Sequence, residues 1–154
     1  LYLDKQDGDS LNDIITFFGN KGDIQINTRL STFDSSFEIS GSENSDLLNE
    51  YNSIIRKYNM QNLDLLEIFY NAQIENNQTR IDSVNSELEN LIRKKYLYTL
   101  NFSITNSANE ISPYIAVSQI PDANVDLLRK VYDTLPESIK DSKYGKILKE
   151  ITID

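Results

Sequence analysis

The 154-residue sequence contains neither cysteine nor histidine. Without cysteine it can form no disulfide, no thiolate nucleophile and no Cys-x-x-Cys redox pair. Without histidine it lacks an imidazole base and the usual zinc ligand, which excludes Ser-His-Asp and Cys-His catalysis. Carboxylate catalysis and the binding of calcium or magnesium through oxygen ligands remain compatible with the sequence.

Long apolar runs and an excess of positive charge are also missing. No apolar run approaches the roughly 20 residues that cross a bilayer, so we expect no transmembrane segment. The formal net charge of −9 disfavours a nucleic-acid partner, and it equally disfavours an anionic membrane surface. The chain begins at Leu1 without an initiator Met or a signal sequence. We therefore expect it to be an excised or processed part of a longer protein.

The composition is that of a folded chain. Hydrophobic residues make up 39% and aromatic residues 10% of the sequence, which is not typical of disorder. A chain of this size buries roughly 70% of its surface on folding and needs no disulfide or metal to hold a core.

Residues 1–41 have the pattern of β-structure. Residues 14–18 are a β-rich run that ends at the turn signal of residues 19–22. Residues 23–27 and 37–39 alternate polar and apolar side chains, the period of a half-buried strand. We expect two to four antiparallel strands here, which are marginal on their own and must pack against helices or against missing strands. In the second case they are part of a larger sheet that is truncated at its N-terminus.

Residues 42–154 have a helical period. Ser42 offers an N-cap, and the apolar stripe that follows it up to Tyr58 predicts a long helix. A second long helix is expected from Asn77 or Thr79. The two are expected to form an antiparallel pair, because the apolar spacing does not extend over enough heptads for an extended coiled coil.

Residues 96–104 fit two patterns. Tyr96, Tyr98, Leu100, Phe102 and Ile104 alternate with other residues as in a strand, yet they follow the second helix with no Gly or Pro between. We favour a helix, and a buried one, because its side chains are apolar on several sides.

Shorter helices complete the predicted fold. One is expected from about Ser112, one after Pro121 and one from Lys143 to about Ile151, in which Gly145 is a weak point. The sequence thus predicts an α+β, mostly α fold: a short antiparallel β segment followed by a bundle of five to six helices, together forming one domain.

An acidic cluster near the N-terminus superficially resembles a calcium loop. Asp4, Asp7 and Asp9 are spaced so that carboxylates could converge on a hard cation. An EF-hand counted from Asp4 requires Gly at its sixth position and Glu at its twelfth, where this chain has Asp9 and Ile15. A solvated turn is the preferred interpretation.

Paired carboxylates of the glycosidase type have no support in the sequence. Glu87 and Glu89 lie two residues apart and so do not share a helix face. Asp64 and Glu67 do share one, but nothing basic or apolar nearby marks them as an acid–base pair.

The remaining candidates have ordinary structural explanations. The basic run Arg93–Lys95 follows Glu87 and Glu89, so i,i+4 pairing and the dipole at a helix end explain it. The aromatic stretch Tyr96, Tyr98 and Phe102 could line a ligand groove, although such a stripe is more often core. Two glycosylation sequons begin at Asn77 and Asn101, the second inside the expected buried helix. We therefore expect no catalytic, cofactor-binding or metal-binding residue, and no enzyme activity in this chain.

Three passages follow one another along the chain: a strand–Gly-Ser–helix segment, a helix-to-helix segment and two closing helices. They are residues 24–26 with 37–51, residues 102–107 with 112–116, and residues 128–135 with 142–148. In this order they resemble a family of uncharacterised domains that precede thioredoxin-like modules in envelope proteins of Gram-negative gut bacteria. Ser107 or Ala108 stands where the family usually has Pro.

The resemblance implies a periplasmic protein or an outer-envelope lipoprotein that faces the periplasm. A C-terminal thioredoxin-like module, absent from this chain, would carry the Cys-x-x-Cys chemistry. This chain would then serve positioning, dimerisation or client recognition. It would contact a protein partner or that module, and it could form a homodimer. The alternatives are an independent peptide- or glycan-binding helical module with exposed rings at residues 96–102, and a carboxylate enzyme with two converging acids.

Overall fold

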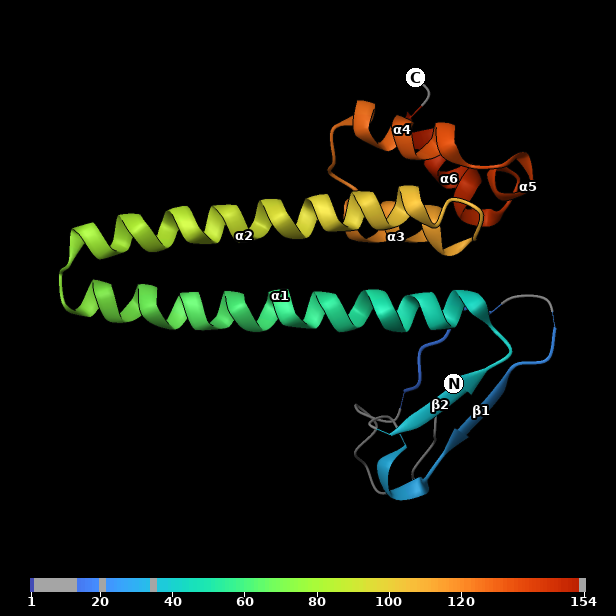
Figure 1. Ribbon diagram of the computed structural model, residues 1–154, viewed down its shortest axis with the longest axis horizontal. Helices are drawn as coiled ribbons and strands as arrows, with labels where there is room; N and C mark the ends of the chain where they lie inside the picture. Colours follow the sequence, from blue (N-terminus) through green and yellow to red (C-terminus); the bar gives the residue numbers. More distant parts are fainter. Residues whose placement is uncertain (2–13, 20–21, 34–35, 153–154) are drawn as a thin grey trace. The chain divides into compact units, whose positions relative to one another are not determined.

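The computed structural model of the protein describes residues 1, 14–19, 22–33 and 36–152. Two strands, β1 (Gln25–Thr28) and β2 (Phe37–Ser40), flank a short 3-10 helix, η1 (Leu30–Thr32). Six helices follow: α1 (Glu43–Ile74), α2 (Gln78–Thr105), α3 (Ile111–Gln119), α4 (Val125–Thr134), α5 (Glu137–Lys140) and α6 (Lys143–Thr152) (Figure 1). The predicted class, α+β and mostly α, is confirmed.

Two compact units divide the chain, residues 1–50 and residues 51–154. Their border falls inside α1, later in the chain than residue 41, where the sequence pattern changes from strand to helix. The expectation that the β segment and the helices form one domain stays a prediction.

The strands of the first unit form the expected antiparallel pair. Ile26 lies opposite Ile39, and Thr28 lies opposite Phe37. Gly41 follows β2 with a φ of +85°, and a Cβ atom there would collide with the carbonyl oxygen of Asp23. Glycine at this position therefore allows the chain to leave the sheet and enter α1.

Residues 14–18 do not form the predicted strand. Ile14 makes only an isolated bridge, with the Ile15 N–H donating to the carbonyl of Leu1 at 2.8 Å. Phe18 is held by serine side chains at the start of α1: its N–H donates to Ser45 Oγ at 3.0 Å, and its carbonyl accepts from Ser42 Oγ at 3.1 Å. Side-chain hydroxyls thus take the place of a neighbouring strand. Part of the predicted turn, residues 20 and 21, lies outside the described residues.

A tight turn reverses the chain between α1 and α2. Asn76 adopts a left-handed φ of 52°. The N–H of Asn77 donates to the carbonyl of Ala72 at 2.9 Å, and the N–H of Asn76 donates to the carbonyl of Gln73 at 3.1 Å. This pair of bonds is a Schellman C-cap. Asn77 then caps α2, because its side chain accepts from the Arg80 N–H at 3.1 Å.

From residue 51 onward, α1 and α2 run antiparallel, side by side, as predicted (Figure 1). A seam of buried and half-buried side chains joins them, and its positions are spaced alternately by three and four residues. The seam consists of Tyr51, Ile55, Tyr58, Asn62, Leu65, Phe69 and Ala72 on α1, and of Ile81, Val84, Leu88, Leu91, Lys95, Tyr98 and Phe102 on α2. The spacing is that of a coiled coil of about three heptads.

The second half of α2 is packed on two opposite sides. Tyr98 and Phe102 lie against Tyr51 of α1, with ring centroids 5.7 and 5.0 Å from the Tyr51 ring. Leu100 belongs instead to the core that α2 forms with α3, α4 and α6, against which Tyr96 and Ile104 also pack. Alternate residues therefore face alternate neighbours, which explains a strand-like pattern in a helix. The prediction of a helix is confirmed.

Most of residues 96–104 are buried or half-buried, as expected of a buried helix. Leu97 and Asn101 are the exceptions and are exposed, because neither α1 nor the helices α3–α6 cover their side of α2.

Helices α3–α6 enclose the main core of the second unit. It is built from Leu100 together with Ala116, Ile120, Leu128, Val131, Leu135, Ile139 and Leu148. The predicted helices are present, and α5, which begins after Pro136, was not predicted. Ser142 caps α6 by accepting from the Gly145 N–H at 3.2 Å.

Gly145 is not the weak point that helix propensity predicts. A Cβ atom at this position would collide with the carbonyl oxygen of Ile139 and lie 2.6 Å from that of Lys140. Glycine therefore permits the close approach of α5 and α6.

Candidate interaction surface

The outer face of α1, opposite the seam, carries a second apolar stripe. Met60, Leu63, Tyr70 and Ile74 are between 59% and 79% exposed. Their spacing places them one above the other along the helix, interrupted by Glu67. Single exposed apolar residues are normal, whereas four aligned on one helix face are typical of a contact surface.

Two further apolar side chains are exposed on α2. Ile92 lies beside the seam, and Leu97 lies on the side of α2 that neither α1 nor α3–α6 covers. They are five residues apart and do not continue the stripe on α1. The outer face of α1 is therefore a separate surface.

A groove of about 390 Å³ runs along one side of the seam between α1 and α2. Its half-buried or buried residues are Leu65 and Leu91, and its exposed rim is polar and charged: Gln61, Asp64, Glu87, Asn90 and Lys94. The groove brings together Asp64 and Glu87, one from each helix. Sequence reasoning paired each of these carboxylates within its own helix and so missed this pairing.

A smaller pocket of about 150 Å³ lies on the other side of the seam. Lys95 occupies a seam position there, and its Nζ donates a hydrogen bond to Asn59 Oδ1 at 3.0 Å. Asn62, also at a seam position, lines the same pocket. The seam thus contains one polar layer among apolar ones, a device that fixes the register of paired helices.

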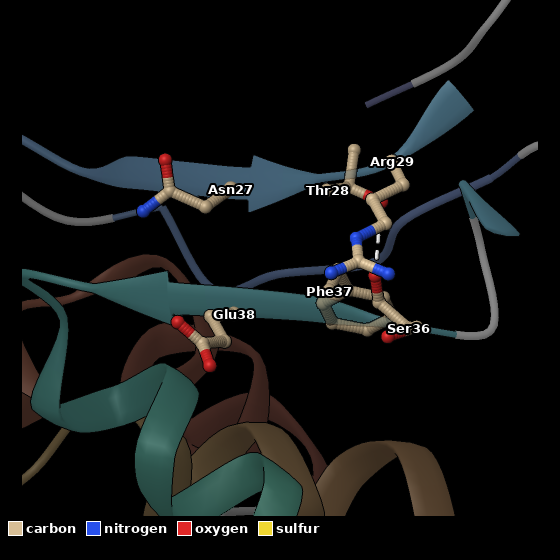
Figure 2. Close-up of a pocket in the computed structure, with 6 residues that line it drawn as sticks. All are labelled: Asn27, Thr28, Arg29, Ser36, Phe37 and Glu38. Atoms are coloured by element: carbon tan, nitrogen blue, oxygen red, sulfur yellow. Dashed lines mark hydrogen bonds between the residues drawn. The ribbon is translucent and has the colours of Figure 1, made fainter. Parts of the chain in front are cut away.

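A third hollow, of about 420 Å³, lies on the β-hairpin and is lined by Asn27, Thr28, Arg29, Ser36, Phe37 and Glu38. Figure 2 shows Arg29 extending from the end of β1 toward Ser36 and Phe37. The Thr28 hydroxyl bonds to backbone carbonyls, 2.9 Å from that of Phe33 and 3.1 Å from that of Ser36. The two charged residues, Arg29 and Glu38, are both exposed, so this hollow is an open polar surface.

The aromatic stretch of α2 does not form one wall. Tyr96 faces the α3–α6 core, while Tyr98 and Phe102 face α1. Phe102 is buried, and Tyr96 and Tyr98 are half-buried. Tyr51 has a raised pKa because burial removes water from its hydroxyl, with a smaller contribution from the nearby Tyr98. These rings are mainly core.

The acidic candidates do not converge on a metal. No group of three or more Asp or Glu side chains that could hold a metal ion occurs among the described residues. Asp4, Asp7 and Asp9 lie outside the described residues. Glu87 and Glu89 are both exposed.

The basic run Arg93–Lys95 lies in the interior of α2, which continues to Thr105, so the predicted helix-end explanation is wrong. The structure records no ion pair between this run and any other described residue. The predicted i,i+4 pairing with Glu87 or Glu89 is therefore also wrong. Lys95 instead takes part in the polar layer of the seam.

The two sequons occupy structural positions. The Asn77 side chain caps α2. In the second sequon Asn101 is exposed, whereas Ser103 is fully buried between α2 and α3.

No family model matches the sequence, and no curated protein or solved structure is significantly similar to it. Within the described part of the chain, no helix is both long enough and apolar enough to cross a membrane.

Proposed function

We propose that this chain is a non-catalytic accessory module that acts by holding another protein in place. The observation that carries the proposal is the row of exposed apolar side chains on α1, at Met60, Leu63, Tyr70 and Ile74. Burying a side chain of this size stabilises a complex by about 1.5–3 kcal/mol, so such a row favours protein contact.

The absence of cysteine and histidine from the whole sequence also supports a non-catalytic role. Asp64 and Glu87 line the same groove, but both are exposed. A carboxylate pair that performs acid–base catalysis depends on environments that differ strongly between its two members. Two water-exposed carboxylates offer no such difference.

The setting that we propose is a periplasmic thioredoxin-like thiol–disulfide oxidoreductase, for which this chain serves positioning, dimerisation or client recognition. The support is the family resemblance, in particular the strand–Gly-Ser–helix order. Here β2 ends at Ser40, Gly41 turns the chain and Ser42 caps α1, since its Oγ accepts from the Ser45 N–H at 3.2 Å.

Reading the coding sequence around this chain tests the setting. A downstream thioredoxin-like segment with a Cys-x-x-Cys pair supports it, and a coding sequence without one overturns it. A parallel assay tests the non-catalytic role: the purified chain should reduce insulin no faster than buffer, with thioredoxin as the positive control. Measurable turnover by the chain would overturn that role.

One observation favours a second candidate, an independent peptide- or glycan-binding module. The groove of about 390 Å³ combines the apolar side chains of Leu65 and Leu91 with a polar rim that includes Lys94. Such a lining suits an extended polar ligand. Titration with peptides and oligosaccharides should then shift the methyl resonances of Leu65 and Leu91, while those of Leu128 in the core stay unchanged.

A further inference from the structure

We infer that the outer face of α1 binds a second copy of this chain, with the two α1 helices packed antiparallel about a two-fold axis. The inference rests on the proposed function, because it selects dimerisation among the roles proposed for the module. Symmetric dimers use the same patch on both partners, so the patch must be complementary to itself. The centre of the outer face of α1 meets this requirement in the order of its apolar and charged residues.

The apolar centre of the face is symmetric. Arg56 stands one turn before Met60, and Glu67 stands one turn after Leu63, with equal spacing on the two sides. An antiparallel copy therefore places Met60 against Leu63 of the copy, and it places Arg56 against Glu67 of the copy. Two-fold symmetry repeats each contact, which encloses four apolar side chains between two ion pairs.

A second pair of charges follows the same symmetry. Lys57 and Asp64 lie along one flank of the stripe, and the antiparallel arrangement brings Lys57 beside Asp64 of the copy. None of the ion pairs among the described residues involves Lys57, Asp64, Arg56 or Glu67. Arg56 Nε donates only a long hydrogen bond of 3.4 Å to the Asn52 carbonyl in its own helix, so none of the four charges is neutralised within the described residues.

The opposite orientation is disfavoured. Parallel α1 helices would place Arg56 against Arg56 of the copy and Glu67 against Glu67 of the copy. Like charges in contact cost stability, so the charge order on α1 selects the antiparallel dimer.

The interface is small. The helix between Arg56 and Glu67, the two ends of the symmetric contact, is about 17 Å long, at about 1.5 Å per residue. A contact of this length is at the low end of specific interfaces, which bury about 1,200 Å² or more in total. The dimer is thus expected to be weak and concentration-dependent. It should weaken further at high salt, because its ion pairs lie at the rim.

Sedimentation velocity of the purified chain, from low micromolar to several hundred micromolar, tests the inference. The wild type should shift from monomer to dimer over this range. Met60→Lys and Leu63→Lys should each abolish the shift, whereas the matched control Ile92→Lys, an equally exposed apolar position on α2, should leave it unchanged. Circular dichroism establishes that every variant is folded.

Charge exchange tests the orientation. Arg56→Glu alone and Glu67→Arg alone should each weaken the dimer by about tenfold. The double variant Arg56→Glu/Glu67→Arg should recover dimerisation, because each reversed charge again meets its opposite on the copy. A wild-type chain that stays monomeric, a dimer insensitive to Met60→Lys, or a double variant without recovery would each overturn the inference.

These outcomes are separate from those of the proposed function. A strictly monomeric chain overturns the dimer and leaves an accessory role by positioning or client recognition intact. A coding sequence without a Cys-x-x-Cys segment overturns the proposed setting and leaves the dimer intact.

Discussion

The hydroxyl of Tyr51 on α1 lies 2.9 Å from Oγ1 of Thr99 on α2, and both side chains are buried. Thr99 Oγ1 also lies 2.9 Å from the carbonyl of Lys95. Because a carbonyl can only accept, the Thr99 hydrogen is directed to Lys95, and Tyr51 must donate to Thr99. This chain of two hydrogen bonds links the two long helices at the end of the seam that lies away from their connecting turn.

Tyr51→Phe should lower the free energy of unfolding by about 1 kcal/mol, the net value of a buried hydrogen bond. Thr99→Val should cost more, about 1–3 kcal/mol, because it leaves the buried Tyr51 hydroxyl without an acceptor. The double variant should cost less than the sum of the two. Urea denaturation measures all three, and Tyr70→Phe, at an exposed ring, is the control that should change stability by less than about 0.5 kcal/mol. Equal costs for the two single variants would contradict the assigned donor.

Stability should fall as the pH rises above 10. Burial raises the pKa of Tyr51 above its ordinary value of 10.0. Above that pH the unfolded chain releases the Tyr51 proton while the folded chain retains it, so the unfolded state is favoured. The stabilisation is complete below pH 10 and is lost as the pH rises toward the raised pKa. Denaturation series between neutral and alkaline pH should show a smaller decline for Tyr51→Phe than for the wild type. Identical declines would mean that Tyr51 does not contribute.

The sequence predicts most of the helices because their apolar residues follow one regular period. The sequence is a weaker guide where a segment packs on two opposite sides, or where side chains bond its backbone in place of a neighbouring strand. The alternation of residues 96–104 arises from packing on two sides of one helix, which a single-period pattern cannot represent. Residues 14–18 have strand-like side chains, but their backbone is satisfied by Ser42 and Ser45, whose role depends on the tertiary fold.

The candidate surfaces were harder to predict than the fold. The outer stripe of α1 becomes visible only once the inner stripe is assigned to the seam with α2. That Asp64 and Glu87 line one groove depends on the register of the two helices, which are joined by the turn at Asn76. Neither relationship is encoded in the spacing of residues along a single helix.

Ser103→Ala should leave stability unchanged or raise it by up to about 1 kcal/mol. Ser103 is fully buried between α2 and α3, and its hydroxyl has no hydrogen-bond partner. An unsatisfied buried hydroxyl costs free energy, and alanine is also the better helix former. Thermal unfolding measures the change. Ser112→Ala, the matched control, removes the 2.6 Å bond that Ser112 donates to the Ser103 carbonyl and should be destabilising. A clear loss of stability for Ser103→Ala would reveal a partner for its hydroxyl.

Gly145→Ala should destabilise the protein by about 1–3 kcal/mol, the usual cost of overpacking. At an unconstrained helix position the same change is stabilising by about 1 kcal/mol. The sign reverses here because the new methyl group would meet the carbonyl oxygens of Ile139 and Lys140. Ser83→Ala, at an exposed position of α2, is the control and should be neutral or slightly stabilising. Urea denaturation of both variants checks the prediction, and an increase in stability for Gly145→Ala would refute the close packing of α5 on α6.

Ser45→Ala should release residues 14–18 from the start of α1 without unfolding the helices. Ser45 Oγ accepts from the Phe18 N–H at 3.0 Å and donates to the Phe18 carbonyl at 3.2 Å, so the substitution leaves that N–H without its acceptor. Hydrogen exchange read by NMR should show about tenfold or greater loss of protection at the Phe18 amide, which corresponds to roughly 1.4 kcal/mol. Amides of α4 and α6, in the second unit, should keep their protection because local opening need not involve the whole chain. Asn52→Ala, at an exposed position of α1, is the matched control and should leave the Phe18 amide protected. If Ser45→Ala also left it protected, some other group would have to hold this segment.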